Sequence, residues 1–279
     1  MGQNGITRNM KTFFLGLGAQ KAGTTWLYHH LTGHPDVSFP QGKELHYWNR
    51  TELPVATEWR SLLKAGSDNV RAVGEITPAY FHLPPTRIAV IHQAFPDLRI
   101  FVSLRNPITR AWSAALMELA RLSRRVAETD DDWFVDHVLS AASLARGSYA
   151  ANLERWRSIF PPEQLLVSLF EDIERQPVAL LTELARHLGV NGAWYQQIET
   201  RALQQVVVPL LKAGSKPVRS EVCLVRPAIG SLLALHYRDE VTQLSSMLDQ
   251  DLTGWLDEVS WSTPSSIGER IEVPAGLDQ

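Results

Sequence analysis

A lysine set in a loop of small residues offers the first chemistry in this chain, a site for an anion. Residues 13–17 form a short apolar run typical of a buried strand, and residues 18–23 form a loop that contains Lys21. Thr24 and Thr25 then supply hydroxyl groups at the start of a helical pattern. Because backbone N–H groups at a helix start and a lysine ammonium both attract negative charge, the pattern predicts an anion cradle. A surface turn with a solvated lysine is the alternative.

The loop departs from the two common phosphate-binding patterns. In the nucleoside-triphosphate loop G-x-x-x-x-G-K-[ST], the lysine follows the second glycine. Gly18 and Gly23 have that spacing, but Thr24 stands at the lysine position and Lys21 lies inside the loop. The dinucleotide pattern G-x-G-x-x-G also fails, because Lys21 stands where a third glycine belongs after Gly16 and Gly18. The loop therefore indicates an anion site of another kind.

A second cation follows the clearest buried strand of the sequence, residues 99–104. Arg105 comes directly after this strand, and Arg110 and Ser113 lie on the predicted helix that follows. An enzyme that uses a magnesium nucleotide commonly places an acidic metal ligand at such a strand end. An arginine with a nearby hydroxyl suits a phosphate monoester instead. The acidic pair at 171–172 is a counter-signal, which we interpret as a solvated turn at a helix start.

Glu44 and His46 are candidates for proton transfer. If residues 43–48 are extended, both side chains point to the same side, because strand residues two apart share a face. A carboxylate beside an imidazole could then act as a general base with its partner. The alternative is an exposed loop with aromatic anchors.

A basic segment lies between residues 201 and 220, where the sequence is typical of a loop. Lys212, Lys216 and Arg219 stand there among glycine, serine and proline. Such a segment could fold over a bound anion, and an ordinary surface loop is the alternative.

The composition limits the class of protein. The 279 residues suffice for one large α/β domain or two small ones, and 44% hydrophobic with 20% charged residues is typical of a soluble globular protein. A net charge of −3 argues against a nucleic-acid binder and gives no support for a large polyanionic substrate. Cys223 is the single cysteine, which excludes an intrachain disulfide and favours a reducing compartment. Since the chain has neither an apolar run of about 18 residues nor a signal-peptide pattern, we expect a cytoplasmic protein without a transmembrane segment.

The rest of the pattern supplies the elements that must position these residues. Predicted strands cover residues 13–17, 37–39, 70–74, 99–104 and 165–170. Predicted helices begin at Thr24 with Gly33 as C-cap and at Pro177 with Gly189 as C-cap. Further helices are expected at 86–95, 107–121, 226–238 and 240–250, and a helix with a loop is expected within 53–69.

Several of these segments, taken in order, resemble the bacterial and heparan-sulfate-modifying branch of the sulfotransferases that use 3′-phosphoadenosine 5′-phosphosulfate (PAPS). Residues 21–27, KAGTTWL, resemble the 5′-phosphosulfate loop of that family, and residues 105–113, RNPITRAWS, resemble its 3′-phosphate segment. Residues 43–48, KELHYW, resemble the segment that carries the glutamate base. Residues 75–81, EITPAYF, resemble the family pattern E-K-T-P-x-Y-F, and residues 237–256 resemble its closing helices.

The resemblance implies a transfer of sulfonate from PAPS to a hydroxyl, in preference to an amine, of a carbohydrate, lipid or other small-molecule acceptor. It implies that Lys21 neutralises charge on the leaving phosphate, so that no metal is expected. Glu44 would take the acceptor proton, and His46 would orient Glu44 or act as the base itself. Arg105 and Ser113 would hold the 3′-phosphate of the donor. The residues implied in donor binding are Lys21, Ala22, Gly23, Thr24, Thr25, Trp26, Arg105, Ser113, Lys212 and Lys216.

The resemblance also implies the fold: an α/β domain with a P-loop-like central parallel β-sheet, helices on both faces, and the site at the carboxyl ends of the strands. We expect one domain over residues 11–260 and a flexible tail over 261–279. Ile76 replaces the family lysine that touches the sulfonate or the acceptor. Two other functions remain open, a P-loop kinase or NTPase and a non-catalytic nucleotide-binding protein. The sequence indicates neither the acceptor nor the oligomeric state.

Overall fold

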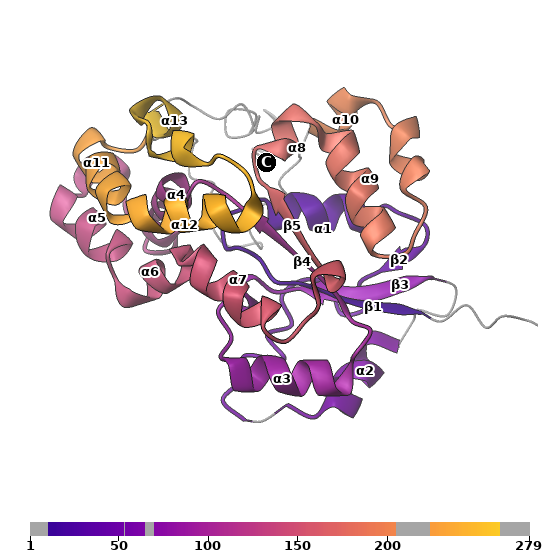
Figure 1. Ribbon diagram of the computed structural model, residues 1–279. Coiled ribbons are helices and arrows are strands. Elements are labelled where there is room, and N and C mark those ends of the chain that lie inside the picture. Colours follow the sequence, from indigo (N-terminus) through magenta and orange to yellow (C-terminus); the bar gives the residue numbers. More distant parts are fainter. Residues whose placement is uncertain (1–10, 53, 65–69, 205–223, 263–279) are drawn as a thin grey trace, which may run out of the picture.

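The computed structural model describes residues 11–52, 54–64, 70–204 and 224–262. Five strands form one parallel sheet in the order β2-β3-β1-β4-β5, as Figure 1 shows. Their bounds are β1 Thr12–Gly16, β2 Val37–Ser38, β3 Ala72–Ile76, β4 Arg99–Leu104 and β5 Leu165–Leu169. All five predicted strands are present. The prediction for β3 was two residues too early, since Glu75 and Ile76 lie inside the strand rather than after it.

The parallel register brings the carboxyl ends of three strands together. β1 is central, with Phe14 paired to Gly74 of β3 and to Arg99 of β4. Gly74 allows this close pairing, because a Cβ there would overlap the backbone and ring of Phe14. The segments after β1, β3 and β4 therefore leave the sheet at one edge, where open parallel sheets place their ligand sites.

Helices account for most of the remaining described residues. The helices are α1 Thr24–Thr32, α2 Ala56–Lys64, α3 Pro85–Ala94, α4 Pro107–Arg121, α5 Asp131–Val138, α6 Ala141–Gly147, α7 Tyr149–Arg157, α8 Asp172–Arg175, α9 Pro177–His187, α10 Thr200–Gln204, α11 Pro227–His236, α12 Arg238–Leu248 and α13 Glu258–Ser262. The short 3₁₀ helices are η1 Pro78–Tyr80, η2 Val126–Glu128, η3 Pro162–Gln164, η4 Gly192–Gln197 and η5 Thr253–Leu256.

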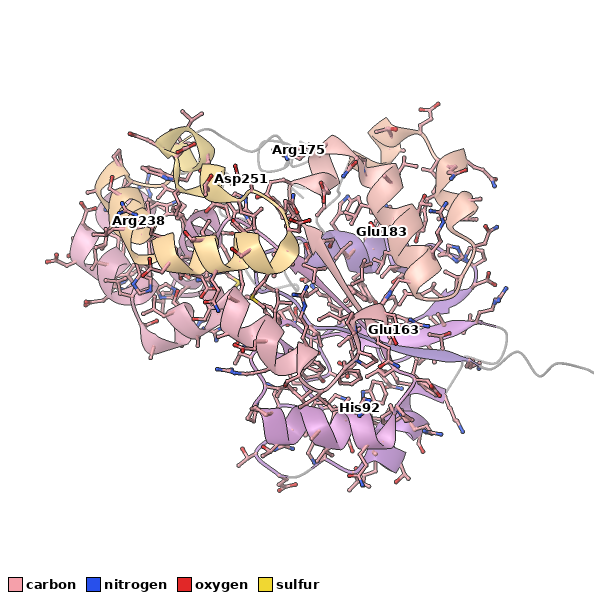
Figure 2. All side chains as sticks on the ribbon, in the orientation of Figure 1. His92, Glu163, Arg175, Glu183, Arg238 and Asp251 are labelled. Atoms are coloured by element: carbon pink, nitrogen blue, oxygen red, sulfur yellow. The ribbon has the colours of Figure 1, made fainter. Side chains whose placement is uncertain are left out.

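The helices cover both faces of the sheet, which confirms the predicted α/β fold. α1 and α9 lie on one face, and α2 and α3 lie on the other (Figure 1). The side chains of α3, where His92 is labelled, and of α9, where Glu183 is labelled, extend on opposite sides of the sheet (Figure 2). The helices α4, α5, α6, α11, α12 and α13 gather beyond the carboxyl edge of the strands (Figure 1).

Strand alternation divides the buried side chains between two cores. Phe14 of β1 and Phe101 of β4 belong to the core under α1 and α9. Leu15 of β1 and Ile100 and Val102 of β4 belong to the larger core on the other face. Since neighbouring strand residues point to opposite faces, the same short apolar strands supply side chains to both cores.

Local signals set the ends of several helices close to where the sequence predicts them. α1 begins at Thr24, and the Gly33 N–H caps it by donating to the carbonyl of His29. α4 begins at Pro107, and the Asn106 side chain before it accepts from the Ile108 N–H. Gly189 follows α9 with φ of 74°, the left-handed conformation that glycine adopts easily.

The structure changes one smaller expectation. Residues 201–204 belong to α10 instead of a loop. The last described helix, α13, spans Glu258–Ser262, and residues 263–279 of the expected tail lie outside the described residues. Three aromatic residues of the segments 43–48 and 75–81 are buried in the core: Trp48, Tyr80 and Phe81.

Candidate functional site

The Lys21 loop, residues 17–25, joins β1 to α1 and is fixed against the neighbouring strand β4. The Ala19 N–H donates to the Ser103 carbonyl at 2.7 Å, and the Ser103 N–H donates to the Gly18 carbonyl at 2.8 Å. Gly18 and Gly23 have φ values of 128° and 80°, which few residues besides glycine adopt. A Cβ on Gly23 would also overlap a side chain of α8. Strand pairing and two glycines thus set the path of the loop.

The start of α1 faces this loop with the features of an anion site. Gly23 is the N-cap and has no side chain that could satisfy the free N–H groups of the first turn. That turn contains no acidic residue. Ala22 and Trp26 are buried, and the Trp26 indole donates to the Leu203 carbonyl at 2.8 Å. Of these two residues, only Trp26 is placed to offer a backbone N–H to an anion, because the Ala22 N–H already donates to the Ala19 carbonyl at 3.2 Å.

Arg105 follows β4 and lies against the Lys21 loop. Its Nη1 donates to the Lys21 carbonyl at 3.0 Å, and its Nε donates to Thr109 Oγ1 at 3.0 Å. The guanidinium lies 4.4 Å from the centre of the Phe170 ring. The Tyr149 hydroxyl donates to the Arg105 carbonyl at 2.9 Å. The structure therefore brings together the two cations that the sequence places 84 positions apart.

The carboxylates near Lys21 and Arg105 offset only part of the cost of placing these two charges there. Burial lowers the pKa of Lys21, and the nearby charges of Arg105 and Lys43 lower it further. Burial also lowers the pKa of Arg105, partly offset by Glu171. In the described part of the chain, none of the ion pairs involves Lys21 or Arg105. A bound anion would therefore relieve the cost of gathering these charges.

The Glu44 segment, residues 42–49, lies beside the Lys21 loop but is not the extended strand that the sequence suggested. Glu44 and His46 have φ values of 64° and 53°, the left-handed region that such residues rarely adopt. Hydrogen bonds to β3 and η1 hold this path. The N–H groups of residues 44, 45, 46 and 48 donate in turn to the Ile76 carbonyl, the Glu75 carboxylate, the Thr77 hydroxyl and the Tyr80 hydroxyl.

The turn brings Glu44 and His46 together as predicted, by a different backbone route. His46 Nε2 lies 3.7 Å from Glu44 Oε2, and both side chains are about half exposed. His46 Nδ1 lies 3.2 Å from Asn49 Oδ1. If Nδ1 carries the proton that this amide oxygen accepts, Nε2 faces the Glu44 carboxylate. The arrangement can hold one proton between a carboxylate and an imidazole.

Glu75 is the buried support of the Glu44 segment. Its carboxylate accepts from the Trp59 indole at 2.7 Å, from the Thr77 hydroxyl at 2.8 Å and from the Tyr80 hydroxyl at 3.0 Å. It also accepts from the Leu45 N–H at 3.2 Å. Burial raises the pKa of Glu75, while these four donors lower it. Because the carboxylate has no exposed surface, its role is to tie α2, η1 and the Glu44 segment together.

A further, partly buried acid, Glu171, contacts the 3′-phosphate segment from outside it. Glu171 is not the solvated turn expected from the sequence: Oε1 accepts from the Asn106 N–H at 3.4 Å, and Oε2 is buried without a partner. Burial raises its pKa. Ser113 is half-buried on the second turn of α4, beyond Arg105.

Ile76 occupies the position of the family lysine, and its side chain is fully buried in the core under α1 and α9. The Ile76 side chain packs over Gly16 together with that of Phe101, since a Cβ on Gly16 would overlap the side chains of both Ile76 and Phe101. The position carries no charge into the site. The basic residues Lys212, Lys216 and Arg219 lie outside the described residues.

Three contributors to the site had no role in the sequence analysis: Lys43, Asn49 and Glu75. Lys43 stands directly before the candidate base, which was the one signal in its favour. Asn49 is three residues after His46 in an irregular segment, where spacing predicts no contact. Glu75 was noticed only as the first residue of a motif, and its hydrogen bonds come from residues between 45 and 80.

Two features are absent from the described residues. No three His, Cys, Asp or Glu side chains in that part of the chain are grouped as they would be around a metal ion. Within the same residues, no helix has the length and apolar character needed to cross a membrane.

Comparison with known sequences gives one family. Residues 12–207 match the model of the sulfotransferase domain. The mouse bifunctional heparan sulfate N-deacetylase/N-sulfotransferase 4 is 28% identical over 87% of this chain, and the aligned region is 31% of that enzyme. The human heparan sulfate glucosamine 3-O-sulfotransferase 6 is 31% identical over 63% of this chain and 51% of that enzyme. The chain thus spans about a third to a half of the length of these relatives.

Comparison with solved structures agrees with the sequence match. The sulfotransferase from Alicyclobacillus acidocaldarius superposes with a TM-score of 0.65 and 25% identity, over 89% of this chain and 99% of that one. The sulfotransferase domain from the curacin biosynthetic pathway shares the fold, with a TM-score of 0.51 and 14% identity over 87% of this chain and 99% of that one. Because the family model covers most of the sheet and the whole Lys21 loop, this chain belongs to the sulfotransferase domain family.

Proposed function

We propose that this protein is a PAPS-dependent sulfotransferase that transfers sulfonate to a hydroxyl group of a carbohydrate acceptor. It acts as a single domain over residues 11–260, and its lone cysteine favours the cytoplasm as its compartment. The observation that carries the proposal is the contact between the Lys21 loop and Arg105, 3.0 Å from Nη1 to the Lys21 carbonyl. This contact joins a cradle for one phosphate to a cation for a second.

The donor set of the site fits PAPS. The free N–H groups at the start of α1, the hydroxyls of Thr24 and Thr25 and the ammonium of Lys21 match the 5′-phosphosulfate group. Arg105, with Ser113 on the next helix, matches the 3′-phosphate. The partly buried cations Lys21 and Arg105 lack an ion-pair partner among the described residues, which supports a dianionic ligand over a neutral one. The basic residues Lys212 and Lys216 would add to the donor site from the loop after α10.

PAPS supplies the sulfonate group, and the residues of this chain supply charge, position and a base. A new bond forms between the acceptor oxygen and sulfur, the bond between sulfur and the 5′-phosphate oxygen breaks, and its electron pair stays on the phosphate. Lys21 and the N–H groups of α1 stabilise that developing charge, and such preorganised donors are worth about 3–4 kcal/mol each. Glu44 takes the acceptor proton, and His46 keeps the Glu44 carboxylate oriented or shares that proton.

The proposed acceptor class rests on the names of the relatives and on which side chains near the site are exposed or buried. Two of the similar enzymes act on heparan sulfate by name, one of them on glucosamine oxygen. The half-exposed Glu44 and His46 leave room for a bulky hydrophilic acceptor at the open side of the site. The core positions of Trp48, Tyr80 and Phe81 argue against a deep aromatic pocket for a phenol or lipid.

The deciding experiment compares two ligands by calorimetric titration of the purified protein. We expect 3′,5′-adenosine diphosphate (PAP) to bind without magnesium, and ATP with magnesium to bind far more weakly. Arg105→Ala should weaken PAP binding by about 10–150-fold, the range for one charge-assisted hydrogen bond pair. Arg124→Ala, an exposed arginine beyond α4, is the matched control and should bind PAP like the wild type.

Either of two results would overturn the proposal. Tight binding of magnesium-ATP alone would make the protein a kinase or NTPase. Binding of PAP and PAPS without sulfonate transfer to any member of a broad oligosaccharide panel would leave a nucleotide-binding protein.

A further inference from the structure

Lys43 is a second lysine at the Lys21 loop that the sequence motifs did not assign. It stands at the beginning of the KELHYW segment, and its side chain is only 16% exposed. The backbone around it is fixed, because the next N–H, that of Glu44, donates to the Ile76 carbonyl at 3.0 Å. This hydrogen bond to β3 therefore fixes the backbone from which the Lys43 side chain extends.

The ammonium of Lys43 lies between the loop and the candidate base. Its Nζ donates to Thr25 Oγ1 at 2.8 Å and to Thr24 Oγ1 at 3.2 Å, both at the start of α1. The same Nζ lies 3.4 Å from Glu44 Oε1. One charged group thus spans the gap between the hydroxyls of the cradle and the carboxylate on the acceptor side.

We propose that Lys43 is a second sulfonate-binding cation of this enzyme, placed on the line from the Lys21 loop to Glu44. The inference rests on the proposed function and deepens it. In an in-line transfer, sulfur lies between the leaving oxygen at the loop and the acceptor oxygen at the base. A cation that contacts both the loop hydroxyls and the base lies alongside the three oxygens of the group in transit.

The charge distribution favours this role over a purely structural one. Burial lowers the pKa of Lys43, and the Glu44 carboxylate partly restores it. Lys43 also lowers the pKa of Lys21, so the two ammonium groups repel each other across the cradle. A lysine needed only to anchor a turn would not have to be held near a second, partly buried cation such as Lys21. An anion between the two lysines turns that repulsion into two favourable contacts.

Lys43 also supplies charge where position 76 supplies none. The family pattern has lysine at 76, whereas Ile76 here is part of the core. Lys43 extends into the site from the Glu44 segment, whose Glu44 N–H donates a hydrogen bond to the carbonyl of Ile76. During transfer, Lys43 keeps its proton and donates to sulfonyl oxygens, the acceptor proton passes to Glu44, and the electron pair of the broken bond stays on PAP.

The test compares the affinity for PAPS with that for PAP, because only PAPS carries the sulfonate. The variants are Lys43→Met, which keeps the length of the side chain without its charge, and Lys43→Arg, which keeps the charge. Lys11→Met, at the amino end of β1 and thus the opposite edge of the sheet, is the matched control. Titrations without acceptor give both dissociation constants for each protein, and thermal unfolding reports whether each variant is folded.

We expect Lys43→Met to weaken PAPS binding about 10-fold or more beyond any change in PAP binding, the usual size of a charge-assisted contact. Lys43→Arg should keep most of the wild-type affinity for PAPS, and Lys11→Met should match the wild type for both ligands. An equal loss for both ligands, or no loss for either, would overturn the assignment of Lys43. Should Lys43→Met not fold, wild-type dissociation constants for both ligands in Lys43→Arg support the role of charge, and an equal loss of affinity for both ligands contradicts it. If the wild type binds neither ligand, the proposed function itself fails and this inference fails with it.

Discussion

The Lys21 loop and the Glu44 segment lie side by side in this molecule, but different forces hold them. The Lys21 loop follows a central strand, and its three residues with positive φ are Gly18, Lys21 and Gly23, two of them glycines. In the Glu44 segment, two residues with side chains, Glu44 and His46, take left-handed conformations. Such conformations cost roughly 1 kcal/mol or more each, which the surroundings must offset.

The compensation for the Glu44 segment comes from outside it. Four of its N–H groups donate to β3 and η1, and one of the acceptors is the buried Glu75. The Lys21 loop depends on backbone pairing with β4 instead. The comparison teaches that the phosphate side of the site is built by local geometry, whereas the acceptor side depends on one distant carboxylate. Variants in the two regions should therefore fail in different ways.

The largest expected effect is on the acceptor side. Glu44→Gln keeps the shape of the side chain but cannot take a proton, so we expect the rate of sulfonate transfer to fall about 10²–10⁴-fold. PAP binding should stay close to that of the wild type, because the cradle is untouched. The rate of PAP formation from PAPS with an active oligosaccharide acceptor gives the first value, and calorimetry gives the second. Glu52→Gln, an exposed control, should behave like the wild type, and a near-normal rate in Glu44→Gln would assign the base to His46.

On the phosphate side, Lys21→Ala should change binding and rate together. We expect transfer to fall about 10²–10³-fold, since a preorganised donor to the leaving phosphate is lost. Affinity for PAP should fall too, unlike in Glu44→Gln. The unfolding midpoint should not fall, because Lys21 is a partly buried cation whose pKa is lowered by burial. Normal PAP affinity with reduced turnover in Lys21→Ala would contradict the expected difference between the two regions.

Glu75→Ala should damage the Glu44 segment by destabilising the protein. Four donors would lose their acceptor, and we expect a loss of about 3 kcal/mol or more in the free energy of unfolding, measured by urea titration. Glu58→Ala removes an exposed carboxylate that also contacts this segment, through Tyr47, and should cost less than about 1 kcal/mol. Equal losses in the two variants would mean that Glu75 is not the main support.

The pKa of Glu75 adds a pH dependence with a definite sign. Because burial raises this pKa in the folded state, the folded protein binds the proton more tightly than the unfolded chain does. The contribution of Glu75 is therefore greatest below its ordinary pKa of 4.5 and declines as the pH rises through the folded-state value. The difference in unfolding free energy between wild type and Glu75→Gln should shrink from pH 4.5 to pH 7. A difference that grows with pH would show that the four donors outweigh burial.

The smallest expected effect is that of Asn49→Ala. Removal of the amide leaves His46 less well oriented toward Glu44, and we expect a drop of about 2–10-fold in transfer rate, in line with one weak exposed hydrogen bond. PAP affinity should not change. Asn49→Asp keeps an acceptor for His46 Nδ1 and should retain most of the activity. If both variants match the wild type, His46 has no positioning role.

Much of the fold followed from apolar periodicity and from helix-end signals. The strands around Phe14 and Phe101 are short apolar runs between turn residues, and Pro107 and Gly189 mark helix ends by their own backbone limits. The segment 43–48 was predicted less well. Its alternation suggested a strand, but the left-handed residues that shape it depend on acceptors in residues 75–80, which no local pattern contains.

The sequence by itself determined the Lys21 loop, the strand that leads to Arg105, and the likeness to sulfotransferases, because each is written in a contiguous run of residues. Tertiary structure alone decided that Arg105 meets the Lys21 carbonyl, that Glu75 is a buried support, and that Lys43 stands between the cradle and the base. The reason is physical: contiguous motifs act through local backbone geometry, whereas these three contacts exist only because parallel strands bring their carboxyl ends to one edge.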